Sequence, residues 1–257
     1  GTTNGDTIPN RLRETLNANP GRGQPQVEIL NFGRVGWDST QELIALATEF
    51  RKYHPDYLLI YDGRNDAFQA SMPHYRPFWN TWNVETDREL NQRSYLKELF
   101  YPVYRLKEKI RGLRHREEYT ERSAHLLFQE KGAGALDFYK AHPGISSVYK
   151  ENLRSMFALA KEMKCKGVVI GLQPQLSWCN KPFSAEEAAF DRNRLQPSWK
   201  KAMLDLFPVM QHAHHEASIS PPLPVADLDL NSLFAAEKGW MFSDDCHATD
   251  EGNRKIA

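Results

Sequence analysis

The stretch "DYLLIYDG", residues 56–63, is a short apolar run that ends in glycine. Such a run is typical of a strand that is buried in a sheet. Similar runs occupy 27–33 ("VEILNFG"), 166–174 ("KGVVIGLQP") and 222–230 ("PLPVADLDL"). Continuously apolar strands are typical of parallel sheets, which are covered on both faces. We therefore predict four parallel strands and expect those over 27–33 and 56–63 to be buried.

Helical patterns alternate with these runs. A helix is predicted over 38–53, with Asp38 or Ser39 as its N-cap, because both side chains can accept backbone N–H bonds at a helix start. Further helices are predicted over 145–165, over 184–217 with a break before Pro197, and from Thr249 onward. The alternation predicts an α/β fold with three layers, α/β/α. In such folds the functional site lies beyond the carboxyl ends of the strands.

Residues 69–144 interrupt this rhythm, and we interpret them as an insertion or lid over the site. The aromatic stretch 72–83, "MPHYRPFWNTWN", is either a platform for a sugar or acyl group or the core of the insertion itself. The basic run 105–116 is interpreted as the solvated face of a helix.

Composition limits the classes of function. The 257 residues suit one α/β domain or two small ones, and 33 basic residues balance 33 acidic ones. Nothing global therefore indicates a nucleic-acid partner or an anionic surface. Three cysteines are too few for a disulfide scaffold, although Cys179 and Cys246 could form one bridge or remain thiols. No apolar run approaches the length of about 18 residues that a membrane span needs.

Polar groups follow three of the apolar runs. "NFGRVGWDST" carries glycines that let a backbone N–H approach a ligand. "YDGRNDAF" places an asparagine just past a strand, and "FSDDCHATDEGN" (242–253) places carboxylates beside a histidine. The glycine stretch lacks the GxGxxG spacing of a dinucleotide site. Together the three segments predict an oxyanion hole and a general base that lack only a nucleophile.

These motifs resemble those of the SGNH (GDSL-like) hydrolase superfamily. "GRVGWDS" is similar to its glycine block, "GRND" (63–66) to its GxND block and "DDCH" (244–247) to its DxxH block. The resemblance implies that the Gly36 backbone N–H and the Asn65 side chain form the oxyanion hole. It also implies that His247 is the general base and that Asp244 orients it, with Asp245 as the alternative orienter.

The resemblance also implies a fold and an activity. It implies one flavodoxin-like domain over residues 1–257 and a serine esterase that hydrolyses ester or O-acetyl groups through an acyl-enzyme. The implied substrate is a small ester or an acylated glycan or lipid, with no cofactor, no metal and no nucleic acid. Alternative functions are O-acyl transfer to a glycan and non-catalytic binding. The resemblance also implies export or tethering at the cell envelope, where relatives of this layout are often found.

The serine block of the family is not found in the chain. "DTIPNRLRETLN" (6–17) resembles the segment that follows the serine turn, with a helix beginning near Pro9. Three interpretations compete: the serine lies upstream of residue 1, Gly1 or Thr2 occupies its position, or the domain is non-catalytic. In the first case the central strand is also missing. We then expect its neighbours to expose unpaired backbone groups and the segment to be poorly stable alone.

Some residues have simpler interpretations than catalysis. Ser39 is explained as a helix cap rather than a nucleophile. His212, His214 and His215 are predicted to lie at the surface, because no carboxylate or cysteine completes a metal set with them. "DLDL" (227–230) is interpreted as a strand end and turn.

Overall fold

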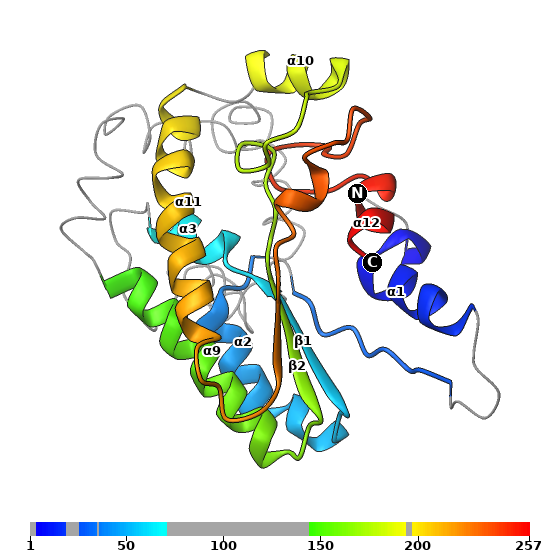
Figure 1. The fold of residues 1–257 in the computed structure, drawn as a ribbon, viewed down its shortest axis with the longest axis vertical. Helices are drawn as coiled ribbons and strands as arrows, with labels where there is room; N and C mark the ends of the chain where they lie inside the picture. The colour runs from blue at the N-terminus through cyan, green and yellow to red at the C-terminus, as the bar shows by residue number, and fades with distance from the viewer. Residues whose placement is uncertain (1–3, 19–25, 35, 71–143, 194–196) are drawn as a thin grey trace, which may run out of the picture.

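The computed structural model describes residues 4–18, 26–34, 36–70, 144–193 and 197–257 (Figure 1). Within them the fold is mixed α/β, with a three-stranded parallel sheet in the order β1-β2-β3. The strands are β1 (Tyr57–Asp62), β2 (Gly167–Leu172) and β3 (Val225–Leu228). The strands predicted from the three later apolar runs are therefore confirmed. The predicted insertion lies almost wholly outside the described residues, as do the aromatic stretch and the basic run.

Helices lie on both sides of the sheet (Figure 1). One side holds α2 (Ser39–Thr48), α9 (Gly144–Glu162) and α11 (Pro197–Ala217), and the other holds α1 (Ile8–Asn17) and α12 (Asp250–Ile256). The other helices of the described residues are α3 (Arg64–Ala70), α10 (Ala185–Asn193) and the short 3₁₀ helices Asn4–Asp6, Phe50–Tyr53 and Ser232–Phe234. This arrangement is compatible with three α/β/α layers.

Two of these helices begin where the sequence predicts, because a side chain caps the first turn of each. Asp38 caps α2, and its carboxylate accepts the N–H groups of Thr40 and Gln41 while the Gln41 side chain accepts the Asp38 N–H. This reciprocal capping box shows that Asp38, rather than Ser39, is the N-cap. Thr249 caps α12 by accepting the N–H of Gly252.

The main core lies between the sheet and the α2, α9 and α11 side. Residues at every second position of a strand point to one face, so Ile60 of β1 and Val168 and Ile170 of β2 reach the same core. They pack with side chains of α9 such as Leu153 and Phe157, which are fully buried. Burial of this apolar surface is the main force that holds these helices on the sheet.

On the side of α1 and α12, the amino-terminal half of β1 is exposed in the described residues. Tyr57 and Leu59 of β1 are 55% and 52% exposed. The outer edge of β1 is open as well. The carbonyls of Asp56 and Asp62 accept hydrogen bonds from the β2 side, so the alternating backbone groups of Tyr57, Leu59 and Tyr61 point to the other edge. No described strand pairs with that edge.

The strand predicted over 27–33 is wrong. This segment has no regular secondary structure, and Val27 and Leu30 are exposed. The Asn17 side chain holds one end through two hydrogen bonds to the Val27 backbone, and Phe32 stacks on Phe50 at 4.0 Å. An apolar run becomes a strand only where a neighbour accepts its backbone hydrogen bonds, and no described strand does so here.

Candidate active site

Asp244 and His247 form a hydrogen-bonded pair on the loop between β3 and α12. Asp244 Oδ2 lies 2.7 Å from His247 Nδ1. Asp244 Oδ1 accepts the backbone N–H groups of Cys246 and His247 at 2.9 and 2.8 Å. The carboxylate is therefore fixed by its own loop, and it fixes the imidazole in turn. The pair orients His247 so that its Nε2 is the nitrogen available for chemistry.

The pair shifts the ionisation of both partners. Burial alone would raise the pKa of Asp244, but the bonds from the His247 side chain and the two backbone N–H groups lower it to about 2. The bond to Asp244 raises the pKa of His247, against the opposing effect of burial. At neutral pH the carboxylate is ionised and stabilises positive charge on the ring.

A buried ion pair supports the start of this loop. Glu187 of α10 accepts the backbone N–H groups of Met241 and Phe242 at 2.9 and 3.0 Å, and its other oxygen pairs with Lys181. Both side chains of the Lys181–Glu187 pair are fully buried. Burial would raise the pKa of Glu187, but Lys181 and the backbone donors lower it. The loop backbone is thus attached to an ionised carboxylate in the protein interior.

Contacts between distant segments bring this loop to the carboxyl end of the sheet. Arg64, which follows β1, donates to Asp245 at 3.3 Å. Gln173, which follows β2, donates its side-chain N–H to the Cys246 carbonyl at 3.0 Å, and the Leu176 N–H bonds the Asp245 carbonyl at 2.9 Å. The GRND and DDCH segments are therefore neighbours. Asp245 lies against Arg64, while Asp244 holds His247.

The glycine segment is attached to the same region. Asn65 donates its side-chain N–H to the Trp37 carbonyl at 2.7 Å. Asp66 accepts both the N–H and the hydroxyl of Ser39, the hydroxyl at 2.5 Å. Two consecutive residues of the GRND segment therefore bind the segment that contains Gly36. Gly36 has φ of +77°, a conformation that glycine adopts without strain.

Gly63 is required at the turn between β1 and α3. Its φ is +91°, and an added Cβ would lie 2.4 Å from a Leu172 methyl group and 2.9 Å from the Tyr149 hydroxyl. The close packing places Asn65 directly beyond the end of β1. A side chain at position 63 would displace the turn that presents Asn65.

A buried polar network lies beneath the site. The Tyr149 hydroxyl is 2.7 Å from Asp62 Oδ1 and 2.9 Å from His214 Nδ1, and His214 Nε2 is 3.1 Å from Asp227. The prediction that His214 lies at the surface is wrong, because this residue is 4% exposed. Its position on α11 turns it toward α9 and the sheet, whereas the neighbouring His212 and His215 are exposed.

Asp62, Asp66 and Glu42 are carboxylic acids in or beside this network whose pKa values are raised. Burial raises the pKa of Asp62, and burial together with the charges of Asp62 and Asp38 raises that of Asp66. Burial and the charges of Asp62 and Asp66 raise the pKa of Glu42. Each of these residues therefore holds its proton more tightly in the folded state than in the unfolded chain.

All three cysteines are free and buried, so the possible bridge between Cys179 and Cys246 is not formed. Burial raises the pKa of Cys179 to about 12 and also raises that of Cys246. Cys246 Sγ lies 3.6 Å from His247 Nδ1. The thiol is thus protonated at neutral pH and is not an activated nucleophile.

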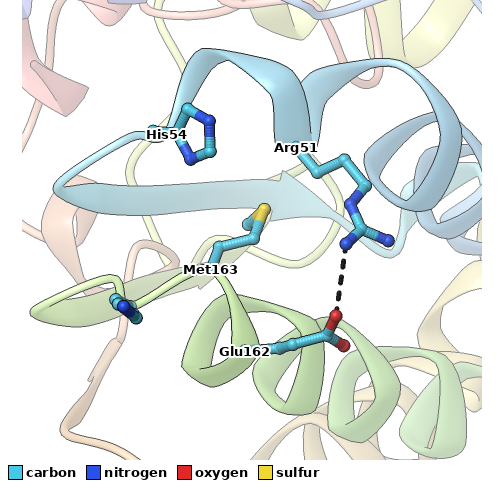
Figure 2. A pocket seen from close by; sticks show the side chains of 5 residues that line it. Arg51, His54, Glu162 and Met163 are labelled. Atoms are coloured by element: carbon cyan, nitrogen blue, oxygen red, sulfur yellow. Dashed lines mark hydrogen bonds and ion pairs between the residues drawn. The ribbon is translucent and has the colours of Figure 1, made fainter.

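A pocket lies at the other end of the sheet (Figure 2). It has a volume of about 200 Å³ and is lined by Arg51, His54, Glu162, Met163 and Lys164, which precede β1 and β2. Arg51 and Glu162 form an exposed ion pair across it. The candidate site follows the carboxyl ends of the same strands, so the pocket does not belong to it.

The motifs predicted Gly36, Asn65, Asp244 and His247, and the structure adds residues that hold them. Arg64 occupies the variable position of the GRND segment, and Gln173 stands just after β2; neither has a sequence signal beyond its place at a strand end. No pattern in the sequence indicated a role for Tyr149, because its hydrogen-bond partners come from distant elements.

No protein-family model matches the chain, and a search of curated proteins finds no match. Among the described helices, none combines the length and apolar character that crossing a bilayer requires. The motifs and the geometry of the site carry the functional conclusion.

Proposed function

We propose that the chain forms a flavodoxin-like SGNH-type domain that acts as a serine hydrolase on carboxylic esters. The substrate class is a small ester, or an O-acetyl or longer acyl group on a glycan or lipid. The reaction transfers the acyl group to a serine and then to water. His247 is the general base, Asp244 its orienting residue, and Gly36 and Asn65 the oxyanion donors.

The Asp244–His247 pair carries this proposal. The carboxylate binds Nδ1 at 2.7 Å, so Nε2 is the ring nitrogen that it leaves available. In the described part of the chain Nε2 makes no hydrogen bond, and the His247 side chain is 69% exposed. An oriented, accessible imidazole with an ionised partner is the arrangement that a general base in acyl transfer needs.

The oxyanion donors fit the same reaction. A primary amide has two N–H groups, and Asn65 gives one of them to the Trp37 carbonyl, so the second can bind substrate oxygen. The Arg64–Asp245 contact ties the segment of Asn65 to the loop of His247. Donors and base thus come from neighbouring segments at the carboxyl end of the sheet. Loss of one oxyanion donor typically costs about 3–4 kcal/mol of transition-state stabilisation.

The nucleophile in this proposal is a serine that precedes residue 1 and lies after a strand that pairs with β1. The open edge of β1 and its exposed Tyr57 and Leu59 support such a strand. Ser39 is a poor candidate, because its hydroxyl is buried and donates to Asp66. Among the described residues, no serine hydroxyl bonds the His247 ring.

The test is active-site labelling of the full-length protein with its preceding segment. A fluorophosphonate should label one serine, which mass spectrometry of the labelled peptide would identify. The variant His247→Ala should lose labelling and turnover of a p-nitrophenyl ester. His212→Ala, which removes an exposed histidine of α11, is the matched control and should behave as wild type. A folded wild-type protein that takes up no label would overturn the hydrolase proposal in favour of a binding domain.

A further inference from the structure

The loop of the candidate base brings together three different metal-binding groups. One ligand atom each from Asp244, Cys246 and His247 lies within 4.8 Å of the others. Cys246 Sγ is 3.6 Å from His247 Nδ1, which in turn is 2.7 Å from Asp244 Oδ2. A thiol, an imidazole and a carboxylate are the donor types that bind zinc in proteins.

One of the separations, between sulfur and nitrogen, matches that of a tetrahedral site. With Zn–S of about 2.3 Å and Zn–N of about 2.0–2.1 Å, sulfur and nitrogen ligands lie about 3.6 Å apart. Cys246 and His247 already have this spacing. Tetrahedral oxygen and nitrogen ligands lie about 3.3 Å apart, so the Asp244–His247 contact must open slightly. The exposed His247 ring has room to make this adjustment.

We propose that Asp244, Cys246 and His247 bind a thiophilic divalent cation such as Zn²⁺, which switches off the general base. The cation replaces the proton that Asp244 and His247 share and is bonded to Asp244 Oδ2, Cys246 Sγ and His247 Nδ1. Water fills the fourth position. The site is reached from solvent on the His247 side, and Cys246 closes it from the interior.

When His247 is neutral, binding of the cation displaces one proton from Cys246 and relocates one on His247. The thiol of Cys246 releases its proton to solvent as the S–Zn bond forms. The proton on Nδ1 of His247 moves through solvent to Nε2, because a neutral imidazole that binds metal through Nδ1 carries its hydrogen on Nε2. One proton is therefore released for each cation bound, and the ligands and metal together lose one positive charge.

This change of tautomer would inhibit the enzyme. A protonated Nε2 cannot accept the proton of a nucleophile, so the metal-bound imidazole is no longer a base. Inhibition rests on the proposed function, whereas metal binding does not. Nearby charges act in both directions: the Asp245 carboxylate favours a cation, and Arg64, which pairs with it, opposes one.

Cobalt tests the site directly, because a thiolate bound to Co²⁺ gives a sulfur-to-metal charge-transfer absorption. Titration of the full-length protein with Co²⁺ should produce this absorption with one equivalent, and Zn²⁺ should remove it. Cys246→Ser should abolish the absorption. Cys179→Ser is the matched control, since this buried thiol contacts Asn231 and lies outside the cluster. Absence of the band in wild type, or its persistence in Cys246→Ser, would overturn the proposal.

A second measurement covers the case in which Cys246→Ser fails to fold. X-ray absorption of the zinc-loaded wild-type protein should show one sulfur at about 2.3 Å with nitrogen and oxygen neighbours. A zinc coordination shell made of nitrogen and oxygen alone would also contradict the proposal.

The activity measurement separates this proposal from the hydrolase proposal. Zn²⁺ should inhibit ester turnover, EDTA should restore it, and Cys246→Ser should need more than about tenfold more Zn²⁺ for the same inhibition. A protein that gives the cobalt band but has no reactive serine would retain the metal site and lose the hydrolase proposal. An active enzyme that gives no cobalt band would retain the hydrolase proposal and lose the metal site.

Discussion

Arg64 Nη2 lies 3.3 Å from Asp245 Oδ2, and this contact joins segments 181 residues apart in the chain. Both side chains are largely buried, at 12% and 16% exposed. Arg64 precedes Asn65, and Asp245 follows Asp244. The contact therefore ties the segment of the proposed oxyanion donor to the loop of the proposed base.

Replacement of Arg64 should separate these two segments. We expect Arg64→Met to destabilise the fold by about 1–3 kcal/mol, because it leaves the Asp245 carboxylate largely buried without its guanidinium partner. It should also lower kcat of ester hydrolysis more than it changes KM. Arg51→Met, which breaks an exposed pair with Glu162, should cost less than about 1 kcal/mol. Equal effects of the two variants in urea unfolding would contradict this role.

Asp244→Asn should preserve the conformation of the loop and abolish the function of His247 as a general base. An asparagine oxygen can still accept the N–H groups of Cys246 and His247, but it cannot stabilise a charged imidazole. By analogy with the serine-protease triad, kcat should fall by about 10⁴ with the fold retained. Asp205→Asn, at an exposed pair with Lys201, is the control. Activity of Asp244→Asn close to wild type would contradict the assignment.

Glu187→Gln should weaken the support of the loop. The change leaves Lys181 buried without its counter-charge, which costs about 3–5 kcal/mol in buried pairs. The lowered pKa of Glu187 stabilises the fold above the pKa of the unfolded chain, and this stability is lost as pH falls through the folded-state pKa. The difference in the free energy of unfolding between wild type and variant should therefore be larger at neutral pH than at acidic pH. The exposed Glu151→Gln serves as control in the same denaturation series.

Glu42→Gln should reduce the loss of stability that accompanies rising pH. The folded-state pKa of Glu42 is raised by burial and by Asp62 and Asp66. Stability is therefore greatest below the unfolded-state pKa and declines as pH rises through the folded-state value. Melting temperatures from pH 5 to 8 should fall less in the variant than in wild type. An unchanged slope would show that Glu42 does not interact with Asp62 and Asp66. The exposed Glu49→Gln is the control.

Ser39→Ala should affect stability rather than chemistry. The Ser39 hydroxyl donates to Asp66 and accepts from Asn152, so its loss leaves buried groups unpaired at a cost of about 1–3 kcal/mol. Fluorophosphonate labelling of the full-length protein should persist. Loss of the label with the fold intact would make Ser39 the nucleophile. Ser218→Ala, which removes an exposed hydrogen bond to the His215 carbonyl, should change neither property.

The sequence by itself determined the features that depend on neighbouring residues. The strands β1, β2 and β3 follow from short apolar runs, and the starts of α2 and α12 follow from Asp38 and Thr249. The Asp244–His247 contact is also local, because its partners are three positions apart on one loop. Capping and short-range hydrogen bonds are set by chain spacing, so a pattern of residues is sufficient to predict them.

The tertiary structure decided the features that need a distant partner. The run 27–33 is not a strand, because its backbone meets no described strand, and His214 is buried because α11 packs against α9. The Arg64–Asp245 contact and the Gln173–Cys246 contact arise only when the ends of β1 and β2 lie together. Packing of apolar faces sets these distances, and a linear sequence does not specify which faces meet.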